Sequence, residues 1–113
     1  MSPRDLVYVG HMLDMARKAV TKTRDLSREE YDGDENLRLA LIHLIQVIGE
    51  AARQVSVEFI DTHSEIPWAN IIGMRHKVVH DYLGVDEDIV WQVVITDLPE
   101  LVARLEPLVP SAF

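Results

Sequence analysis

Residues 37–55 read LRLALIHLIQVIGEAARQV. Apolar side chains recur in this stretch at steps of three and four residues, at Leu37, Leu41, Leu44, Ile48, Ala51, Ala52 and Val55. That spacing puts them on one face of an α-helix, because a helix completes a turn about every 3.6 residues. The stretch therefore predicts a long helix that buries one stripe of side chains in a protein core.

Similar stripes lie on both sides of this helix. One runs from Leu6 to Val20, and another runs from Ile89 to Leu105 with an expected kink or restart at Pro99, because proline lacks the N–H that a helix interior needs. A further helix is expected to begin at Pro67 and to turn three apolar side chains inward, those of Trp68, Ile71 and Ile72. No segment has the pattern of a strand pair. The fold class is therefore all-α, an up-and-down four-helix bundle.

The connections between these helices carry their own signals. Ser27 to Glu30 has the capping-box pattern, a hydroxyl three residues before a carboxylate, and predicts a short extra helical turn that ends near Gly33. Residues 57–66 are expected to form a break between helices. Gly84 allows a turn, and Asp86 can cap the last helix. No repeat or composition change divides the chain, so residues 1–113 are expected to form one domain.

Composition excludes several classes of protein. The 113 residues are 48% hydrophobic and 27% charged, the usual balance of a soluble globular protein. There is no cysteine, which excludes a disulfide framework, a thiolate zinc site and a cysteine nucleophile. No apolar run approaches the ~20 residues of a membrane span, and the charged N-terminus lacks the apolar core of a signal peptide. A cytoplasmic protein without a membrane association is expected.

The net charge of −8 argues against loose binding to nucleic acid, which depends on many lysines and arginines. Six of the eleven basic residues lie in the first 28 positions, whereas Arg104 is the only one after His80. The acidic C-terminal part is expected to form a solvated face. Contact with a nucleic acid must then be local, around Arg75 and Lys77.

Residues 75–82, RHKVVHDY, hold the most reactive set of side chains in the chain. Arginine offers a planar fork of donors to phosphate oxygens, and histidine can give or take a proton near neutral pH. On a straight helix Arg75 and His80 would diverge by roughly 140°. Either the helix loosens near His80, or a two-fold axis brings two copies of the motif around one cleft. We expect the second arrangement, a homodimer.

Other polar residues were weighed beside this motif. His76 and His80 are four residues apart and share a helix face, but no Asp, Glu or Cys at helical spacing completes a site, so neither a metal nor another cofactor is expected. Glu50 follows His43 and Gln46 on one face of the long central helix. It either orients an active-site residue or a dimer partner, or it is simply solvated; the sequence favours neither.

The order Arg75, His76, His80 and Tyr82 resembles the Arg-X4-His-X-Tyr signature of the HepT-like toxins, a branch of the HEPN ribonuclease superfamily. The resemblance covers roughly Arg4 to Val109. Flanking segments agree with it, namely Ile48 to Ala52, Ile66 to Trp68, Gly73 to Arg75, Val90 to Trp91 and Asp97 to Leu101.

The resemblance implies a homodimeric, metal-independent endoribonuclease that is the toxin of a type VII-like toxin–antitoxin pair. Arg75 and His80 would be catalytic, and His76, Lys77 and Glu50 would support them. The partner would be an MntA-like minimal nucleotidyltransferase, an antitoxin that silences the toxin by transferring AMP to Tyr82. Cleavage would proceed by attack of the ribose 2′-OH on the phosphate, with RNA as substrate.

Two readings without catalysis compete with this one. In the first, the chain is a helical partner that binds nucleotide or substrate for a separate nucleotidyltransferase. In the second, it is a dimerisation module with a polar seam, and Tyr82 is a packed tyrosine at a helix end. The net acidity favours both over a broad nuclease, whereas the complete set of Arg75, His80 and Tyr82 favours the toxin.

Overall fold

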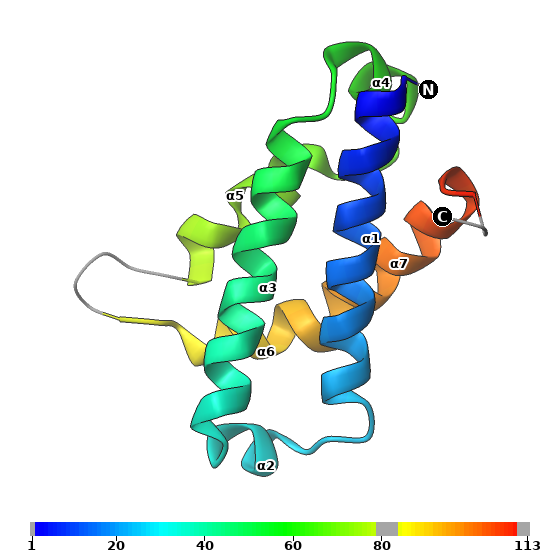
Figure 1. Cartoon of the computed structure of the whole chain (residues 1–113). Helices are drawn as coiled ribbons and strands as arrows, with labels where there is room; N and C mark the ends of the chain where they lie inside the picture. Colours follow the sequence, from blue (N-terminus) through cyan, green and yellow to red (C-terminus); the bar gives the residue numbers. More distant parts are fainter. Residues whose placement is uncertain (1, 79–83, 111–113) are drawn as a thin grey trace.

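Four helical rods make up the body of the molecule (Figure 1). The computed structural model describes residues 2–78 and 84–110. Three rods are unbroken, α1 (Pro3–Thr23), α3 (Glu35–Arg53) and α5 (Trp68–Val78). The fourth has consecutive pieces, α6 (Glu87–Gln92), the π-helical turn η2 (Val93–Asp97), α7 (Leu98–Leu105) and the 3-10 turn η3 (Glu106–Leu108). The predicted all-α class is confirmed, and α1 and α3 run in opposite directions as an up-and-down bundle requires.

The predicted extra turn is present as α2 (Arg28–Asp32). The Ser27 hydroxyl accepts a hydrogen bond of 3.0 Å from the Glu30 N–H, and the Glu30 carboxylate accepts one of 3.0 Å from the Ser27 N–H. This reciprocal pair is the capping box that the sequence predicted. The turn ends at Gly33, where the chain reverses toward α3.

The break expected at residues 57–66 is wrong in its first half. The structure has a short helix there, α4 (Val57–Thr62), capped by the Ser56 hydroxyl, which accepts a hydrogen bond from the Phe59 N–H. Six residues are too few to show a helical period in the sequence. Phe59 is buried, so α4 is held by packing as well as by its cap.

The predicted kink near Pro99 takes the form of a π-helical turn. Pro99 lies in the first turn of α7. It has no N–H to donate to the Ile95 carbonyl, four residues earlier, and in a regular α-helix its ring would clash with that carbonyl. Widening the preceding turn relieves both problems. The Leu98 N–H accordingly donates to the Val93 carbonyl, five residues back.

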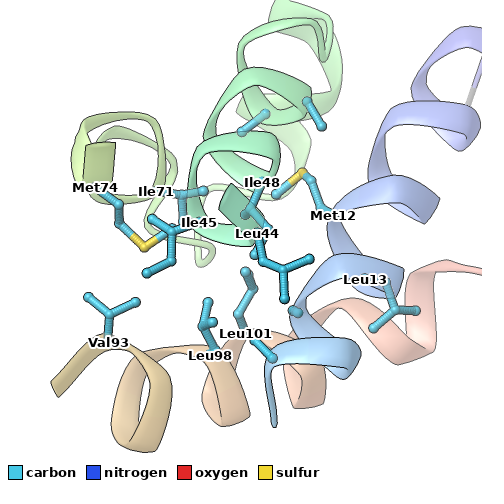
Figure 2. Close-up of a cluster of buried hydrophobic side chains, with 14 of the residues drawn as sticks. Met12, Leu13, Leu44, Ile45, Ile48, Ile71, Met74, Val93, Leu98 and Leu101 are labelled. Carbon is cyan, nitrogen blue, oxygen red and sulfur yellow. The ribbon is translucent and has the colours of Figure 1, made fainter. Parts of the chain in front are cut away.

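The core lies where the rods meet, and α3 occupies its centre by packing on both α1 and α5 while α7 packs on α1. Figure 2 shows Met12, Ile48, Ile71 and Leu101 converging from four helices. Of the residues predicted to turn inward beyond Pro67, Trp68 and Ile71 are buried, whereas Ile72 is only half-buried. None of the helices described in residues 2–78 and 84–110 is long and apolar enough to cross a membrane.

Candidate active site

Three basic side chains, Arg75, His76 and Lys77, occupy the last turn of α5, and all are exposed. Cations are favourable there because the helix C-terminus carries a partial negative charge. The other end of α5 is anchored by Trp68, whose indole N–H donates a hydrogen bond of 3.0 Å to the His63 carbonyl. The Trp68 ring also meets Phe59 of α4 edge to face, with centroids 5.9 Å apart. The helix is therefore fixed at its start and presents its cations at its end.

A cleft of about 470 Å³ lies between α3 and α5. The two helices approach closely at Gly49 in the wall of this cleft, where an added Cβ would lie 3.4 Å from the Ile71 carbonyl oxygen. Its lining brings together Gln46, Gly49, Glu50, Arg53, Ala69, Ile72, Gly73, Arg75 and His76. The structure thus places three of the predicted site residues, Glu50, Arg75 and His76, in one cleft.

The charges of this cleft are unevenly paired. Glu50 accepts a 3.0 Å hydrogen bond from Arg53, one helical turn further along α3, and both side chains are more than half exposed. Among the residues that the structure describes, Arg75 and His76 have neither a hydrogen-bond nor an ion-pair partner. Their donors are free to meet a phosphate in the cleft.

Lys77 does not line this cleft. Two helical positions separate it from Arg75, which corresponds to about 200° around the axis, so its side chain leaves α5 on the opposite flank. There it lines a second cavity, between α5 and α7, that also includes Asp97. The structure therefore separates Lys77 from the group in which the sequence analysis placed it.

His80 and Tyr82 lie in segment 79–83, outside the described residues. Val78, the last residue of α5, accepts a hydrogen bond of 2.9 Å at its carbonyl from the Asp86 N–H. Gly84 has a φ of 95°, the left-handed conformation that favours glycine, as its predicted turn requires.

Paired charges hold the start of α6, where the chain returns from the motif. Tyr31, fully buried, donates a hydrogen bond of 2.6 Å to one carboxylate oxygen of Glu87, and Arg38 lies 3.1 Å from the other. Arg28 lies 2.8 Å from Asp88. Glu87 is therefore held against α2 and α3, whereas Asp88, whose side chain is 86% exposed, lies on the solvated face expected of the acidic C-terminal part.

Sequence reasoning overlooked Arg53 as a cleft residue. Its only signal is its position three residues after Glu50, which places the two side chains on one face of a helix. No group of three or more His, Asp or Glu side chains within residues 2–78 and 84–110 is arranged to hold a metal ion.

Comparison with known proteins gives a consistent result. The family model described as "Ribonuclease HepT-like" matches residues 12–108. A protein of Caldanaerobacter subterraneus subsp. tengcongensis, named provisionally as an RNase, is 32% identical over 101 residues, 89% of this chain and 90% of its own. A "Probable ribonuclease HepT" of Thermococcus cleftensis is 36% identical over 86 residues, 76% of this chain and 78% of its own. A third relative, an RNase by provisional name from Methanocaldococcus jannaschii, is 29% identical over 107 residues, 94% and 98% of the two chains. No solved structure matches.

Proposed function

The chain belongs to the HepT-like ribonuclease family, and on that basis we propose that it is the toxin of a type VII-like toxin–antitoxin pair that cleaves RNA without a metal ion. In this proposal residues 1–113 form one HEPN-like helical domain. The observation that carries it is the cleft between α3 and α5, where the unpaired donors of Arg75 and His76 lie beside Glu50.

Arg75 and His80 are the catalytic pair of this proposal. His80 takes the proton from a ribose 2′-OH, and the freed oxygen attacks the adjacent phosphorus. The bond from phosphorus to the 5′ oxygen breaks, and that oxygen takes a proton from the imidazolium or from water. Arg75 donates hydrogen bonds to the phosphoryl oxygens as charge builds on them. The products are a 2′,3′-cyclic phosphate and a 5′-OH, and the reaction balances without an oxidant or a metal.

The other cleft residues act through this pair. His76 lies next to Arg75 in the cleft and donates to the same phosphate or to its neighbour. Glu50 is a positioning residue. Its carboxylate holds the Arg53 guanidinium at 3.0 Å, so that Arg53 does not compete with Arg75 for the phosphate. Lys77, on the other flank of α5, has no part in this step.

A homodimer completes the proposed site. The described part of α5 ends at Val78. If its helical geometry continued to His80, Arg75 and His80 would point about 140° apart, which one phosphate cannot satisfy. A two-fold axis near the ends of two α5 helices places both motifs around one cleft. The corresponding solution mass is twice the 12.9 kDa of one chain.

Tyr82 is the regulatory residue of the proposal. A nucleotidyltransferase antitoxin joins its phenolic oxygen to the α-phosphorus of ATP; the phenol loses its proton, and pyrophosphate leaves. The added phosphodiester carries a negative charge that competes with RNA for the free donors of Arg75, and the adenosine adds bulk. The modified chain is therefore silent.

Growth after expression tests the proposal in cells. The wild-type chain is expected to arrest growth, and His80→Ala is expected to abolish the arrest, because the general base is lost. His43→Ala is the matched control, since His43 is an exposed histidine on α3 outside the cleft. Arrest that persists in His80→Ala, or no arrest by the wild-type chain, contradicts the toxin assignment.

Mass spectrometry tests the regulatory half. Co-expression with a minimal nucleotidyltransferase antitoxin is expected to add an adenylyl group at Tyr82, and Tyr82→Phe is expected to remain toxic in the presence of that enzyme. An unmodified Tyr82 peptide from cells in which growth is rescued would show that the antitoxin acts by another route.

A further inference from the structure

The cavity on the other flank of α5 lies outside the proposed catalytic cleft. Its volume is about 300 Å³, and it is formed by α5 on one side and by the end of η2 and the start of α7 on the other. Lys77 reaches it from the same helical turn that sends Arg75 and His76 into the catalytic cleft. The last turn of α5 therefore contributes side chains both to the cleft between α3 and α5 and to this cavity.

The floor of this cavity is apolar. Ile71 and Met74 of α5 face Leu98 and Leu101 of the fourth rod, as Figure 2 shows, and all four are buried and line the cavity. Because these side chains are packed together in the core, each at most 5% exposed, their edges form a small apolar floor on which one face of a flat ring can rest, beside the thioether of Met74. A space of this size and character fits a single heterocycle better than a sugar or a phosphate.

The rim of the cavity is polar and carries charges of both signs. Arg104 is already engaged, because it binds the Glu100 carboxylate at 2.9 Å and the Glu65 carbonyl at 2.9 Å. The side chains of Lys77, Asp97 and Asn70 make no hydrogen bond within the part of the chain that the structure describes. The rim therefore offers one ammonium donor, one carboxylate acceptor and one amide to a ligand.

Asp97 lies on the exposed rim of this cavity. Partial desolvation raises the pKa of its carboxyl, the Lys77 charge lowers it, and Glu100 raises it further. Since Arg104 neutralises Glu100, the charges left on the rim are the Asp97 carboxylate and the Lys77 ammonium, which together give a phosphate no net attraction. A neutral ring with N–H donors suits them better.

Guanine has the complementary pattern among the RNA bases. Its N1–H and N2–H lie side by side and can donate together to one carboxylate, while O6 beside them accepts from an ammonium. Adenine has no N–H at N1, cytosine has an acceptor at the corresponding ring position, and the ring N–H of uracil lies between two carbonyls that would face the carboxylate. Asp97 and Lys77 together therefore select one base.

We propose that the cavity lined by Lys77, Asp97 and Met74 binds a guanine base of the RNA that is cleaved at the α3–α5 cleft. This inference rests on the proposed ribonuclease function. The cavity and the cleft lie on opposite flanks of α5, on the order of 10 Å apart, which is about three nucleotides of a stacked strand. The guanine is accordingly a nucleotide near the cleavage site and not next to it.

Binding of nucleosides tests the base site directly, whether or not the chain cleaves RNA. Guanosine is expected to bind about tenfold more tightly than inosine, which lacks the 2-amino group that donates to Asp97. In Asp97→Asn the two are expected to bind about equally. Asp14→Asn, an exposed carboxylate on α1, serves as the control and keeps the tenfold ratio. A ratio unchanged in Asp97→Asn, or no guanosine binding by the wild-type chain, overturns the proposal.

Cleavage of RNA oligonucleotides tests whether the base comes from the substrate. Replacing guanosine by inosine at one position near the cleavage site is expected to lower kcat/KM about tenfold for the wild-type chain and to leave it unchanged for Asp97→Asn. Guanosine binding without any base preference in cleavage would assign the cavity to a free nucleotide and overturn the RNA part. No cleavage of any RNA, with the nucleoside ratio intact, would refute the proposed function and leave the base site standing.

Discussion

The phenol of Tyr31 donates a hydrogen bond of 2.6 Å to the carboxylate of Glu87, 56 residues further along the chain. Burial of the ring, followed by the hydrogen bond to Glu87, raises the pKa of Tyr31 well above its usual value. Because Glu87 is also paired with Arg38, the contact joins α2 and α3 to the first turn of α6. The start of α6, where the chain returns from the proposed catalytic motif, is therefore fixed by residues far away in the sequence.

Tyr31→Phe removes this hydrogen bond and keeps the buried ring. The variant is expected to lose about 1–3 kcal/mol of the free energy of unfolding, since the bond involves a charged acceptor. Urea unfolding measures the loss. Tyr8→Phe is the control, because Tyr8 is half-buried on α1 and its hydroxyl has no hydrogen bond among the described residues; its change is expected to stay within about 0.5 kcal/mol. Equal losses in the two variants would contradict the role of Glu87.

Asp5 joins the start of α1 to the start of α4 in a similar way. It is 3% exposed and accepts hydrogen bonds of 2.8 Å from the Ser56 N–H and 2.7 Å from the Ser56 hydroxyl. Burial alone would raise the pKa of Asp5, but these bonds outweigh it and hold the pKa below its usual value. The ionised carboxylate therefore stabilises the folded chain above the ordinary pKa of about 3.9, and this contribution is lost as the pH falls through the lower folded value.

Asp5→Asn is expected to be less stable than the wild-type chain at pH 7, by about 1–3 kcal/mol. Its free energy of unfolding should also fall less steeply below about pH 4, because the group that protonates is gone. Urea unfolding at a series of pH values checks both. If Asp5→Asn loses stability in acid as steeply as the exposed control Asp14→Asn, Asp5 is not the responsible group.

Gly49 sets the distance between the two walls of the cleft. An alanine Cβ there would lie 3.4 Å from the Ile71 carbonyl oxygen and 3.6 Å from that of Ile72, which is close to ordinary contact. Gly49→Ala is therefore expected to keep its stability to within about 1 kcal/mol, helped by the better helix propensity of alanine. Gly49→Leu must push α5 away and should cost about 1–3 kcal/mol. Unfolding curves compare the pair, and equal effects would mean that the helices do not need to approach here.

Glu50→Gln keeps the size of the side chain and removes the charge that holds Arg53. The ion pair is more than half exposed, so stability is expected to change by less than about 1 kcal/mol. The value of kcat for RNA is expected to fall about tenfold without a rise in KM, because removing the carboxylate favours phosphate binding but lets Arg53 hold the phosphate away from Arg75. Glu58→Gln, an exposed glutamate on α4, should leave cleavage unchanged. Cleavage by Glu50→Gln at the wild-type rate would make Glu50 a solvated residue only.

The rods of the fold could be predicted from apolar periodicity, because each buries one stripe long enough to repeat. The stripe that begins at Leu37 became α3, and Pro99 marked the place where the last rod changes its winding. Helix α4 could not be predicted in this way, because only one of its six residues, Phe59, is buried and a single apolar position shows no period. The pairing of Glu87 with Tyr31 depends on contacts across 56 residues, for which one sequence holds no signal.

The sequence predicts which residues belong to the candidate site better than it predicts how those residues are arranged. Spacing along α5 separates Lys77 from Arg75, but only the positions of α3 and α7 show that each flank of the helix has a cavity of its own. Arg53 lines the cleft because α3 packs on α5, an arrangement that the sequence alone does not show. The roles of His80 and Tyr82 are proposals, because both residues lie outside the described part of the chain.

Cleavage of a synthetic RNA in the presence of a metal chelator tests the central claim most directly. The wild-type chain is expected to yield products with 2′,3′-cyclic phosphate and 5′-OH ends. Arg75→Ala is expected to cut at least about a hundredfold more slowly, because the charge on the phosphoryl oxygens is no longer stabilised. Arg24→Ala, an exposed arginine at the end of α1, should cut at the wild-type rate. Equal rates for Arg75→Ala and Arg24→Ala, or loss of wild-type cleavage in the chelator, would contradict the account.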